Sequence, residues 1–177
     1  MDNLKNEKIC LVGKSGSGKD HLLRGLIKKG LRYQPKITTR PKRKLETEGF
    51  EYNFTTDDIF KSLLESNQIK TYQHFIIENV DWYYSITNQN FDKNQIFILT
   101  PHEISLLSQE DRKKCFIVYL DISEEVRRRR ITKRGDNNDS VNRRIIADEL
   151  DFKSFNDYDL RVTDPDFEVD DVYELMM

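Results

Sequence analysis

One stretch of eight residues, 13–20, limits the fold of this chain more than any other. It reads GKSGSGKD, and it lies between an apolar run at residues 9–12 and a segment whose leucines and isoleucine recur at helical spacing. The apolar run predicts a buried strand, and the recurrence predicts a helix with one apolar side. Glycines between a strand and a helix let main-chain N–H groups curl around an anion, toward which the helix also directs its positive end. The stretch therefore predicts a phosphate-binding loop.

The lysine and the aspartate that end this stretch indicate which phosphate compound binds there. Lys19 suits the β- and γ-phosphates of ATP, as the lysine of a P-loop does. The next residue of a P-loop is normally Ser or Thr, whose hydroxyl binds Mg²⁺, but here it is Asp20. A carboxylate also binds Mg²⁺, but it brings negative charge close to the phosphates, so we expect Asp20 to act as a ligand only with the metal present. The residues expected to hold the nucleotide are Gly13, Ser15, Gly16, Ser17, Gly18, Lys19 and Asp20.

Composition is that of an intracellular globular protein. The 177 residues are enough for one domain with a small insert, and 29 basic against 31 acidic residues do not favour a dedicated nucleic-acid binder. Cys10 and Cys115 lie in apolar runs without metal-ligand spacing, as reduced core residues do. The charged N-terminus has no signal-peptide pattern, and no stretch is apolar and long enough to span a membrane. We therefore expect a cytoplasmic protein.

Strand and helix patterns alternate along most of the chain. Strands are predicted at residues 9–12, 95–99, 115–120 and 160–163. Helices are predicted from Asp20 to Lys29, after Ser123, after Asp139 or Ser140, and from Asp170. The apolar residues assigned to the last two helices are Val141, Ile145, Ile146, Leu150, Val172 and Leu175. This alternation predicts an α/β fold of the P-loop NTPase type, with three α/β/α layers and a parallel sheet.

The interval 36–87 interrupts this alternation. Short strands are predicted at residues 37–39, 50–54 and 69–77. Thr55 or Thr56 is expected to cap a helix between them. The residues expected on the inner side of that helix are Ile59, Phe60, Leu63 and Leu64. We therefore divide the chain into a core, 1–35 and 88–177, and a small α+β insert, 36–87, that overhangs the P-loop at the carboxyl ends of the core strands.

Basic and aromatic residues gather after the first predicted strand of the insert. Residues 38–54 read TTRPKRKLETEGFEYNF, in which two arginines lie three positions apart. Guanidinium groups at this spacing can converge on one phosphate, whose oxygens they bind in pairs. A charged segment is more often a solvated loop, but the fixed spacing of several side chains favours a binding site here. These residues are Arg40, Arg43, Glu46, Gly49 and Tyr52.

This spacing resembles the monophosphate-binding signature of the guanylate kinase family, T-T-R-x-x-R-x-x-E-x-x-G-x-x-Y, at every specified position. It also follows the P-loop at the distance usual in that family. By this resemblance Arg40, Arg43 and Tyr52 grip the phosphate of an acceptor nucleotide. A later YYSIT resembles the family's Y-Y-G-[ST]-[ST], which assigns Tyr84 and Thr87 to the same acceptor site. The resemblance covers nearly the whole chain and implies the family's fold.

A third cluster consists of arginines late in the chain. Residues 127–134 read RRRRITKR, in which Arg127, Arg130 and Arg134 recur at helical spacing and share one face. Such a row is an exposed, self-repelling surface unless an anion binds to it, and phosphoryl transfer needs cations of this kind. A nucleic-acid-binding patch is the alternative, but the row lacks the interleaved aromatic residues of a single-strand platform.

The arginine cluster resembles the lid of the guanylate kinase family, R-L-x-x-R-G followed by a short acidic loop and K-R. By this resemblance the lid spans about residues 130–145, and Arg130, Arg134 and Arg144 are mobile arginines that clamp the transferred phosphate. Near the C-terminus, Thr163 takes the place of an asparagine of the family and is assigned to the nucleotide site.

Several positions depart from the family, and most of them concern the base of the acceptor. Lys36 stands where the family has a serine, and Phe75 where it has a glutamate that pairs with guanine. The two aspartates of the family's L-D-I-D are Thr100 and His102, and Glu103 is a candidate substitute for them. A site that leaves polar groups of a base unpaired rejects that base. The sequence therefore predicts monophosphate kinase activity and leaves the base open.

Together these features predict an ATP-dependent nucleoside monophosphate kinase, similar to guanylate kinase, that acts on GMP, dGMP or a related monophosphate. ATP and Mg²⁺ are the expected cofactors, and the expected catalytic residues are Lys19, Arg40, Arg130, Arg134 and Arg144. We expect a monomer or homodimer that binds a small-molecule substrate, without nucleic acid or membrane. Two alternatives remain open: a guanylate-kinase-like protein-binding module that has lost catalysis, and a kinase of another monophosphate or of a phosphorylated sugar.

Overall fold

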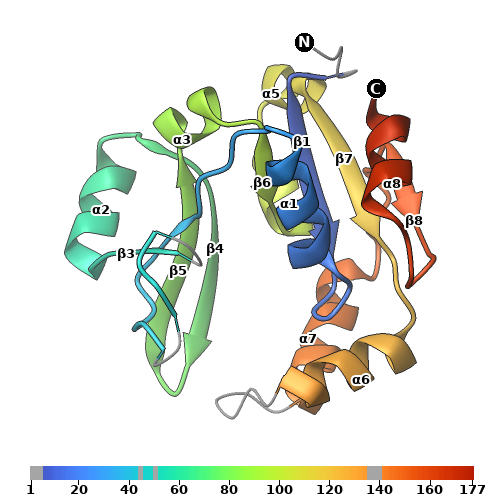
Figure 1. The fold of residues 1–177 in the computed structure, drawn as a ribbon. Coiled ribbons are helices and arrows are strands. Elements are labelled where there is room, and N and C mark those ends of the chain that lie inside the picture. The colour runs from blue at the N-terminus through green and yellow to red at the C-terminus, as the bar shows by residue number, and fades with distance from the viewer. Residues whose placement is uncertain (1–5, 44–45, 50–51, 135–140) are drawn as a thin grey trace.

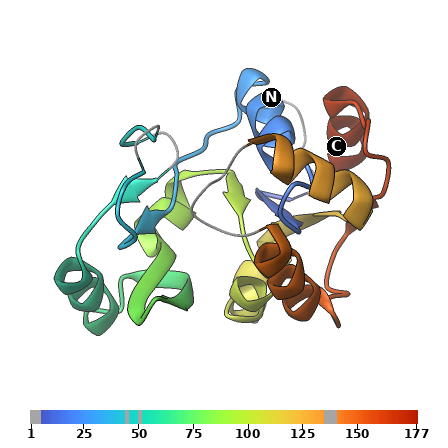
Figure 2. The same cartoon turned by 90° about the horizontal axis from the view of Figure 1, so that it is seen from below.

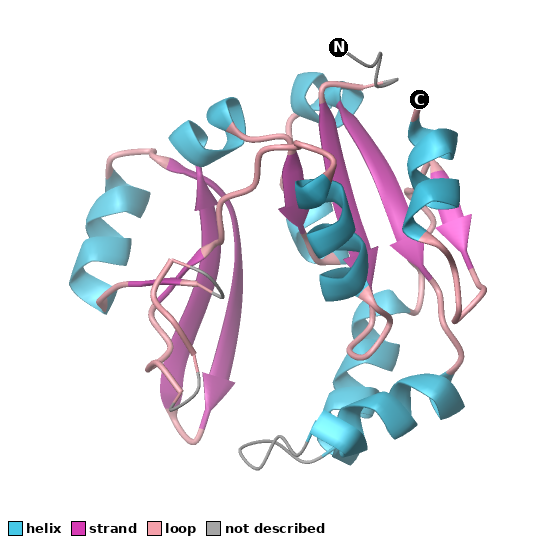
Figure 3. Ribbon diagram, viewed as in Figure 1, coloured by secondary structure: helices cyan, strands magenta, loops and turns pink. Residues whose placement is uncertain are grey.

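The chain forms two four-stranded sheets (Figure 1). The computed structural model describes residues 6–43, 46–49, 52–134 and 141–177. The strands are β1 (Lys8–Gly13), β2 (Ile37–Thr38), β3 (Asn53–Phe54), β4 (Ile69–Ile77), β5 (Val80–Thr87), β6 (Ile96–Ile98), β7 (Cys115–Leu120) and β8 (Leu160–Val162). The helices are α1 (Lys19–Lys28), α2 (Asp57–Glu65), α3 (Asn88–Lys93), α4 (Pro101–Ser105), α5 (Gln109–Lys114), α6 (Glu124–Arg134), α7 (Val141–Phe152) and α8 (Val169–Met176). Figure 3 distinguishes the strands of both sheets from these helices by colour.

The larger core is built on a parallel sheet with the strand order β6-β1-β7-β8. Every residue of β1 and β7 is buried, and their side chains alternate between two apolar clusters. Ile9 and Leu11 share one cluster with residues of α1 and α8, whereas Cys10 and Val12 share the other with residues of α3, α4 and α7. Helices therefore cover both faces of the sheet, which confirms the predicted α/β/α fold with three layers.

The contact between α1 and α8 leads to a prediction about stability. A Cβ on Gly25 would lie 2.8 Å from Val169 Cγ2, and closer still to its Cγ1. Alanine is favoured over glycine in a helix by about 1 kcal/mol, but overpacking of a core costs about 1–3 kcal/mol. We expect Gly25→Ala to lower the midpoint of urea unfolding. Combined with Val169→Ala, it should lose less stability than the two single changes added together, and a raised midpoint for Gly25→Ala alone would contradict this packing.

The second sheet has the strand order β3-β2-β5-β4. Strands β4 and β5 form an antiparallel hairpin. Its turn residues Glu78 and Asn79 have φ angles of 52° and 62°, as in a two-residue turn of type I′. Helix α2 covers one face of this sheet, where Phe60 stacks on Tyr83 with their ring centroids 4.3 Å apart. Tyr84, the next residue of β5, therefore points to the opposite face.

Two crossings, residues 32–36 and 88–95, join the two sheets. Hydrogen bonds hold them side by side: the Gln95 N–H donates to Arg32 O at 2.9 Å, and Asn90 Nδ2 donates to Pro35 O at 3.4 Å. Lys8 Nζ, at the start of β1, donates to Asn94 O at 2.9 Å and so ties the second crossing to the core. The two sheets are thus connected at one end, as Figure 1 shows.

Several predicted apolar faces are wrong. Ile59 and Leu64 are exposed, and Phe60 is the buried residue of α2, because this helix rests on a single sheet and buries only a narrow stripe. The other predicted core residues that prove exposed are Ile146, Leu150 and Leu175. Ile145 and Val172 of the same two helices are buried as predicted. In α8 Met176 is buried where the sequence predicted Leu175 to be.

Strand β5 and helices α3, α4 and α5 have no counterpart among the predicted elements. The three helices have six residues or fewer, which is too short for apolar periodicity to appear. Thr56, rather than Thr55, caps α2. The residues predicted to cap α7, 139 and 140, lie outside the described part of the chain. Within the described part, no helix combines the length and the apolar character needed to cross a membrane.

Candidate active site

The P-loop is a tight turn at the carboxyl end of β1 (Figure 1). Gly16 and Gly18 have φ angles of 77° and 104°, which residues with side chains rarely adopt. A Cβ on Gly13 would lie 2.7 Å from Ser17 Oγ, so this glycine lets the loop fold back onto the strand. The strand, turn and helix predicted from the sequence are therefore present, and the glycines are needed for the shape of the turn.

The N-terminus of α1 lacks a side-chain cap. Its N-cap residue, Gly18, has no side chain that could accept from the first N–H groups of the helix. By contrast, a hydroxyl caps each of α2, α3, α4 and α5; these residues are Thr56, Thr87, Thr100 and Ser108. Helix α8 is also without a side-chain cap, but no glycine-rich turn precedes it. An uncapped N-terminus behind a glycine turn suits an anion, because it combines N–H donors with the positive end of the helix.

Lys19 supplies a positive charge to the same place. Its Nζ donates to Gly13 O at 2.5 Å and to Lys14 O at 3.1 Å, so the ammonium group lies against the loop. Asp20, the next residue, is exposed in the first turn of α1. The two groups that the sequence predicts to meet a phosphate and a metal ion therefore lie at one end of one helix.

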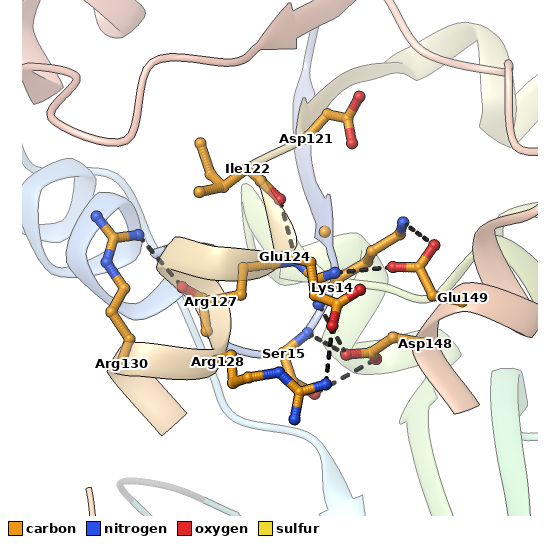
Figure 4. Close-up of polar contacts among 12 residues, drawn as sticks. Lys14, Ser15, Asp121, Ile122, Glu124, Arg127, Arg128, Arg130, Asp148 and Glu149 are labelled. Atoms are coloured by element: carbon orange, nitrogen blue, oxygen red, sulfur yellow. Dashed lines mark hydrogen bonds and ion pairs between the residues drawn. The ribbon is translucent and has the colours of Figure 1, made fainter. Parts of the chain in front are cut away.

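Acidic residues of α7 hold the beginning of the loop (Figure 4). The Ser15 N–H donates to Asp148 Oδ2 at 2.8 Å, and Lys14 Nζ donates to Glu149 Oε2 at 2.7 Å. Arg127 of α6 joins this network, with Nη2 at 2.8 Å from Glu149 Oε1 and Nη1 at 3.6 Å from Asp148 Oδ2. Two positive and two negative side chains therefore connect the loop to α6 and α7, the helices that carry the predicted lid arginines. Figure 2 shows the molecule from this end.

Arg127, predicted to share an anion-binding face with Arg130 and Arg134, instead pairs with carboxylates of α7. The Arg127 side chain is only 1% exposed, and its Nε donates to Ile122 O at 3.0 Å. The physical reason is that α7 packs against α6 and brings carboxylates to this arginine. Sequence reasoning missed Asp148 and Glu149, because no local pattern distinguishes them from the other polar residues of an amphipathic helix.

Arg130 contacts the P-loop from α6. Its Nη1 donates to Gly16 O at 3.2 Å and to Ser17 O at 3.4 Å, and its Nη2 donates to Pro165 O at 2.6 Å. A predicted lid arginine therefore lies beside the predicted triphosphate site.

The other predicted lid residues are less fully described. Arg144 is half-buried on α7. Arg134 ends α6, but its side chain is not described. Residues 135–140, the middle of the predicted lid, lie outside the described part of the chain.

The predicted monophosphate site is organised around a buried arginine on the second sheet. Arg40 is 3% exposed, and its Nη2 donates to Glu46 Oε1 at 2.6 Å. The other carboxylate oxygen of Glu46 accepts from the Arg43 N–H at 2.7 Å. Burial alone would raise the pKa of Glu46, but the bonds from Arg40 and Arg43 outweigh it and hold the pKa below its ordinary value. Glu46 therefore remains ionised and orients Arg40 and the segment around Arg43.

Two tyrosines complete this group. Tyr52 and Tyr84 meet edge to face with ring centroids 5.4 Å apart, and Arg40 Cζ lies 5.4 Å from the Tyr52 ring centroid. Burial raises the pKa of both phenols, although the Arg40 charge opposes it, so both remain protonated donors at neutral pH. The Arg43 charge also acts to lower the pKa of Tyr84. The fold thus brings together Arg40, Arg43, Tyr52 and Tyr84 in what we call the Arg40 cluster.

Two further predicted contact residues lie apart from this cluster. Thr87 Oγ1 accepts from the Asn90 N–H at 3.1 Å and caps α3, so its hydroxyl serves the fold. Thr163 is exposed just after β8. It lies two residues before Pro165, whose carbonyl oxygen accepts from Arg130, so Thr163 belongs to the P-loop side of the molecule.

A second polar group joins the two sheets. Lys36 Nζ lies 2.6 Å from Glu103 Oε1 and 2.5 Å from its Oε2, and the Glu103 side chain is fully buried. Thr100 Oγ1 donates to Gln73 Oε1 at 2.9 Å. The sequence marks Lys36 and Thr100 as departures from a family pattern and Glu103 as a candidate substitute, but their contacts become visible only in the fold.

Comparisons with known proteins agree on one family. A family model described as guanylate kinase matches residues 5–176. A guanylate kinase of Mycoplasmoides gallisepticum is 26% identical over 185 residues, which cover 100% of this chain and 95% of that protein. A guanylate kinase of Rickettsia prowazekii is 27% identical over 166 residues, which cover 90% of this chain and 83% of that protein. The crystal structure of guanylate kinase from Anaplasma phagocytophilum matches 98% of this chain and 84% of that chain with a TM-score of 0.64 and 16% identity.

Proposed function

Because the chain belongs to the guanylate kinase family, we propose that it transfers the γ-phosphoryl group of ATP to GMP or a closely related nucleoside monophosphate. The products are ADP and the nucleoside diphosphate. The observation that carries this proposal is that two groups suited to phosphate lie on different sheets, the P-loop on the parallel sheet and the Arg40 cluster on the other sheet. Each is suited to one phosphate-bearing substrate.

ATP is assigned to the P-loop. The uncapped N-terminus of α1 and the glycines with positive φ suit a polyphosphate. Lys19, whose ammonium group lies against the loop, is proposed to contact its β- and γ-phosphates. The residues proposed to contact the nucleotide are Gly13, Ser15, Gly16, Ser17, Gly18, Lys19, Asp20 and Thr163. Mg²⁺ fits this site, because Asp20 offers an exposed hard oxygen ligand at the same helix end. When bound, the ion neutralises charge on the phosphates.

The acceptor monophosphate is assigned to the Arg40 cluster. Arg40 is held by Glu46, so its guanidinium is oriented before a substrate arrives. Arg43, Tyr52 and Tyr84 add a second positive charge and two hydroxyl donors to the same phosphate. Thr87 is also proposed as an acceptor contact: its hydroxyl oxygen accepts from the Asn90 N–H, and the O–H group can still donate to a substrate.

Chemistry in this arrangement rests on positioning and charge. The acceptor phosphate is already an anionic nucleophile, so the chain needs no general base. Its task is to hold the two phosphates in line and to neutralise the charge that develops during transfer. Arg130, Arg134 and Arg144 are proposed to supply this charge as the lid of about residues 130–145 closes between the core, 1–35 and 88–177, and the insert, 36–87. Closure also excludes water from the transferred group.

An ADP-release assay with MgATP and a panel of acceptors tests the proposal. We expect turnover with GMP and dGMP, and none with ribose phosphates. Thermal stabilisation by MgATP is expected as well. Binding without turnover of any monophosphate would favour a protein-binding module, and turnover confined to a phosphorylated sugar would favour the other alternative.

Asp20→Asn is expected to raise the Mg²⁺ concentration that gives half-maximal turnover by about tenfold, because the ligand loses its charge. Asp58→Asn is the matched control, since Asp58 is also an exposed aspartate in the first turn of a helix, on α2. The measurement is a Mg²⁺ titration at fixed ATP, together with Mn²⁺ binding to the ATP complex followed by electron paramagnetic resonance. An unchanged metal requirement in Asp20→Asn would show that Asp20 is not a ligand.

A further inference from the structure

A row of side chains extends from the Arg40 cluster along one face of the second sheet. In the antiparallel register Thr38 is opposite Tyr84, and Tyr84 is opposite Gln73 on the next strand. Side chains in such a cross-strand row lie on the same face. Lys36 precedes Thr38 by two residues and therefore shares this face, one row away. Arg40 lies two residues beyond Thr38 in the opposite direction along the chain, so about 13 Å of extended chain separates Arg40 from Lys36.

Near Lys36, this face of the second sheet is hydrogen-bonded to the part of the chain that contains the parallel sheet. Lys36 pairs with Glu103, and Gln73 accepts a hydrogen bond from Thr100. Glu103 and Thr100 belong to the start of α4, which follows β6. A mononucleotide whose phosphate lies at Arg40 and whose base lies along this face therefore places that base beside Lys36 and Gln73.

The carboxylate at this end is not available to a base. Glu103 Oε1 accepts from Lys36, and Oε2 accepts from Lys36 and from the Thr100 N–H at 2.9 Å. Its side chain has no exposed surface. Glu46, the carboxylate of the other end, is bound to Arg40 and to the Arg43 N–H. Between these two positions, the described residues of the face offer no carboxylate that could accept from the N1–H and the 2-amino group of guanine.

The groups that remain at this end are donors. The Lys36 ammonium has three protons and only two acceptor oxygens on Glu103. The Gln73 amide accepts from Thr100 through its oxygen, which leaves its NH₂ group directed elsewhere. Two donors suit the edge of a 6-oxopurine, where O6 and N7 are both acceptors. They do not suit adenine, which presents its 6-amino donor at the first of these positions.

We propose that Lys36 and Gln73 select the acceptor by donating hydrogen bonds to the 6-oxo side of a purine, and that the 2-amino group is not read. The substrate class is then the 6-oxopurine nucleoside 5′-monophosphates, with GMP and IMP accepted alike and AMP rejected. This inference rests on the proposed function, because it assigns a base to the acceptor of that reaction.

The wild-type chain tests this inference through kcat/KM for GMP, IMP and AMP at saturating MgATP. We expect GMP and IMP to agree within about tenfold, and AMP to be poorer than both by at least about 100-fold. A GMP preference over IMP of more than tenfold would overturn the inference, and so would AMP within tenfold of GMP, while either result leaves the proposed kinase activity in place. Turnover of none of the three would instead refute the proposed function itself.

A paired variant separates base selection from a purely structural ion pair. Lys36→Met with Glu103→Gln removes the ammonium group without leaving a buried carboxylate unpaired. We expect kcat/KM to fall by about 10- to 100-fold for both GMP and IMP, with little change for AMP or in the KM for ATP. Lys70→Met with Asp111→Asn is the matched control, because this pair, 2.9 Å apart, also joins the two sheets. An unchanged ratio of GMP to AMP in the Lys36 variant, as in the control, would assign Lys36 to the fold alone.

Discussion

Lys19→Ala is expected to lower kcat by about 1000-fold or more while leaving the fold intact. The Lys19 ammonium lies against the P-loop, within hydrogen-bond distance of two main-chain oxygens and at the N-terminus of α1. We propose that this charge meets the γ-phosphoryl group during transfer. Its removal costs the folded chain the two hydrogen bonds to carbonyl oxygens, each contributing about 1 kcal/mol or a little more. The decisive measurement is single-turnover phosphoryl transfer with MgATP and GMP.

The control for this change is Lys28→Ala, which removes an exposed lysine from the other end of the same helix. It should leave both turnover and the unfolding midpoint near their wild-type values. Full activity in Lys19→Ala would remove the basis for placing ATP at the P-loop. A loss of activity that accompanies unfolding, judged by circular dichroism, would leave Lys19 with a structural role only.

Local patterns in the sequence are enough to predict the P-loop and the Arg40 cluster, the two groups proposed to bind phosphate. The P-loop needs a strand, glycines and a helix within about twenty residues, and each of these leaves its own signal. The Arg40 cluster is likewise encoded over a short span, since Glu46 lies six residues from the arginine that it orients. Backbone geometry and the hydrogen bonds of neighbouring residues fix these groups, so little information from the rest of the chain is needed.

Contacts between distant segments were beyond sequence reasoning. The bond between Ser15 and Asp148 spans 133 residues, and the bond between Lys36 and Glu103 spans 67. Both depend on which helix packs on which face of a sheet. The local sequence around Arg127 shows no anionic partner for its row of arginines, and only the packing of α7 brings carboxylates to Arg127.

Helical periodicity also failed where a helix has a single neighbour. The pattern in α2 places four apolar residues inward, but one sheet face can bury only the residues directly above it, of which Phe60 is the best covered. The strand patterns were more reliable, because β1 and β7 are covered on both sides and every apolar residue in them is used.

Arg40→Lys is expected to lower kcat/KM for GMP by about 100- to 1000-fold with little change in the KM for ATP. Lysine keeps the positive charge but cannot donate two parallel hydrogen bonds to a phosphate, and the loss of one or two charge-assisted bonds corresponds to about 3–4 kcal/mol. Arg40 is 3% exposed and donates to Glu46 at 2.6 Å, and these contacts orient its guanidinium. Lysine also keeps a partner for the Glu46 carboxylate, which limits the effect on folding.

The matched control for Arg40→Lys is Arg112→Lys. Like Arg40, Arg112 donates to a carboxylate, with its Nη2 at 2.7 Å and its Nε at 2.9 Å from Asp157 Oδ1. It lies on α5, however, and among the described residues it has no contact with the P-loop or the Arg40 cluster. Both variants replace an arginine that donates to a carboxylate, so a loss of stability is expected in each, while only Arg40→Lys should lose activity toward GMP. If the KM for ATP rose as much as the KM for GMP, Arg40 would belong to the donor site. If the two variants were equally active toward GMP, the acceptor phosphate would have to bind elsewhere. Its assignment to the Arg40 cluster predicts that only Arg40→Lys loses activity.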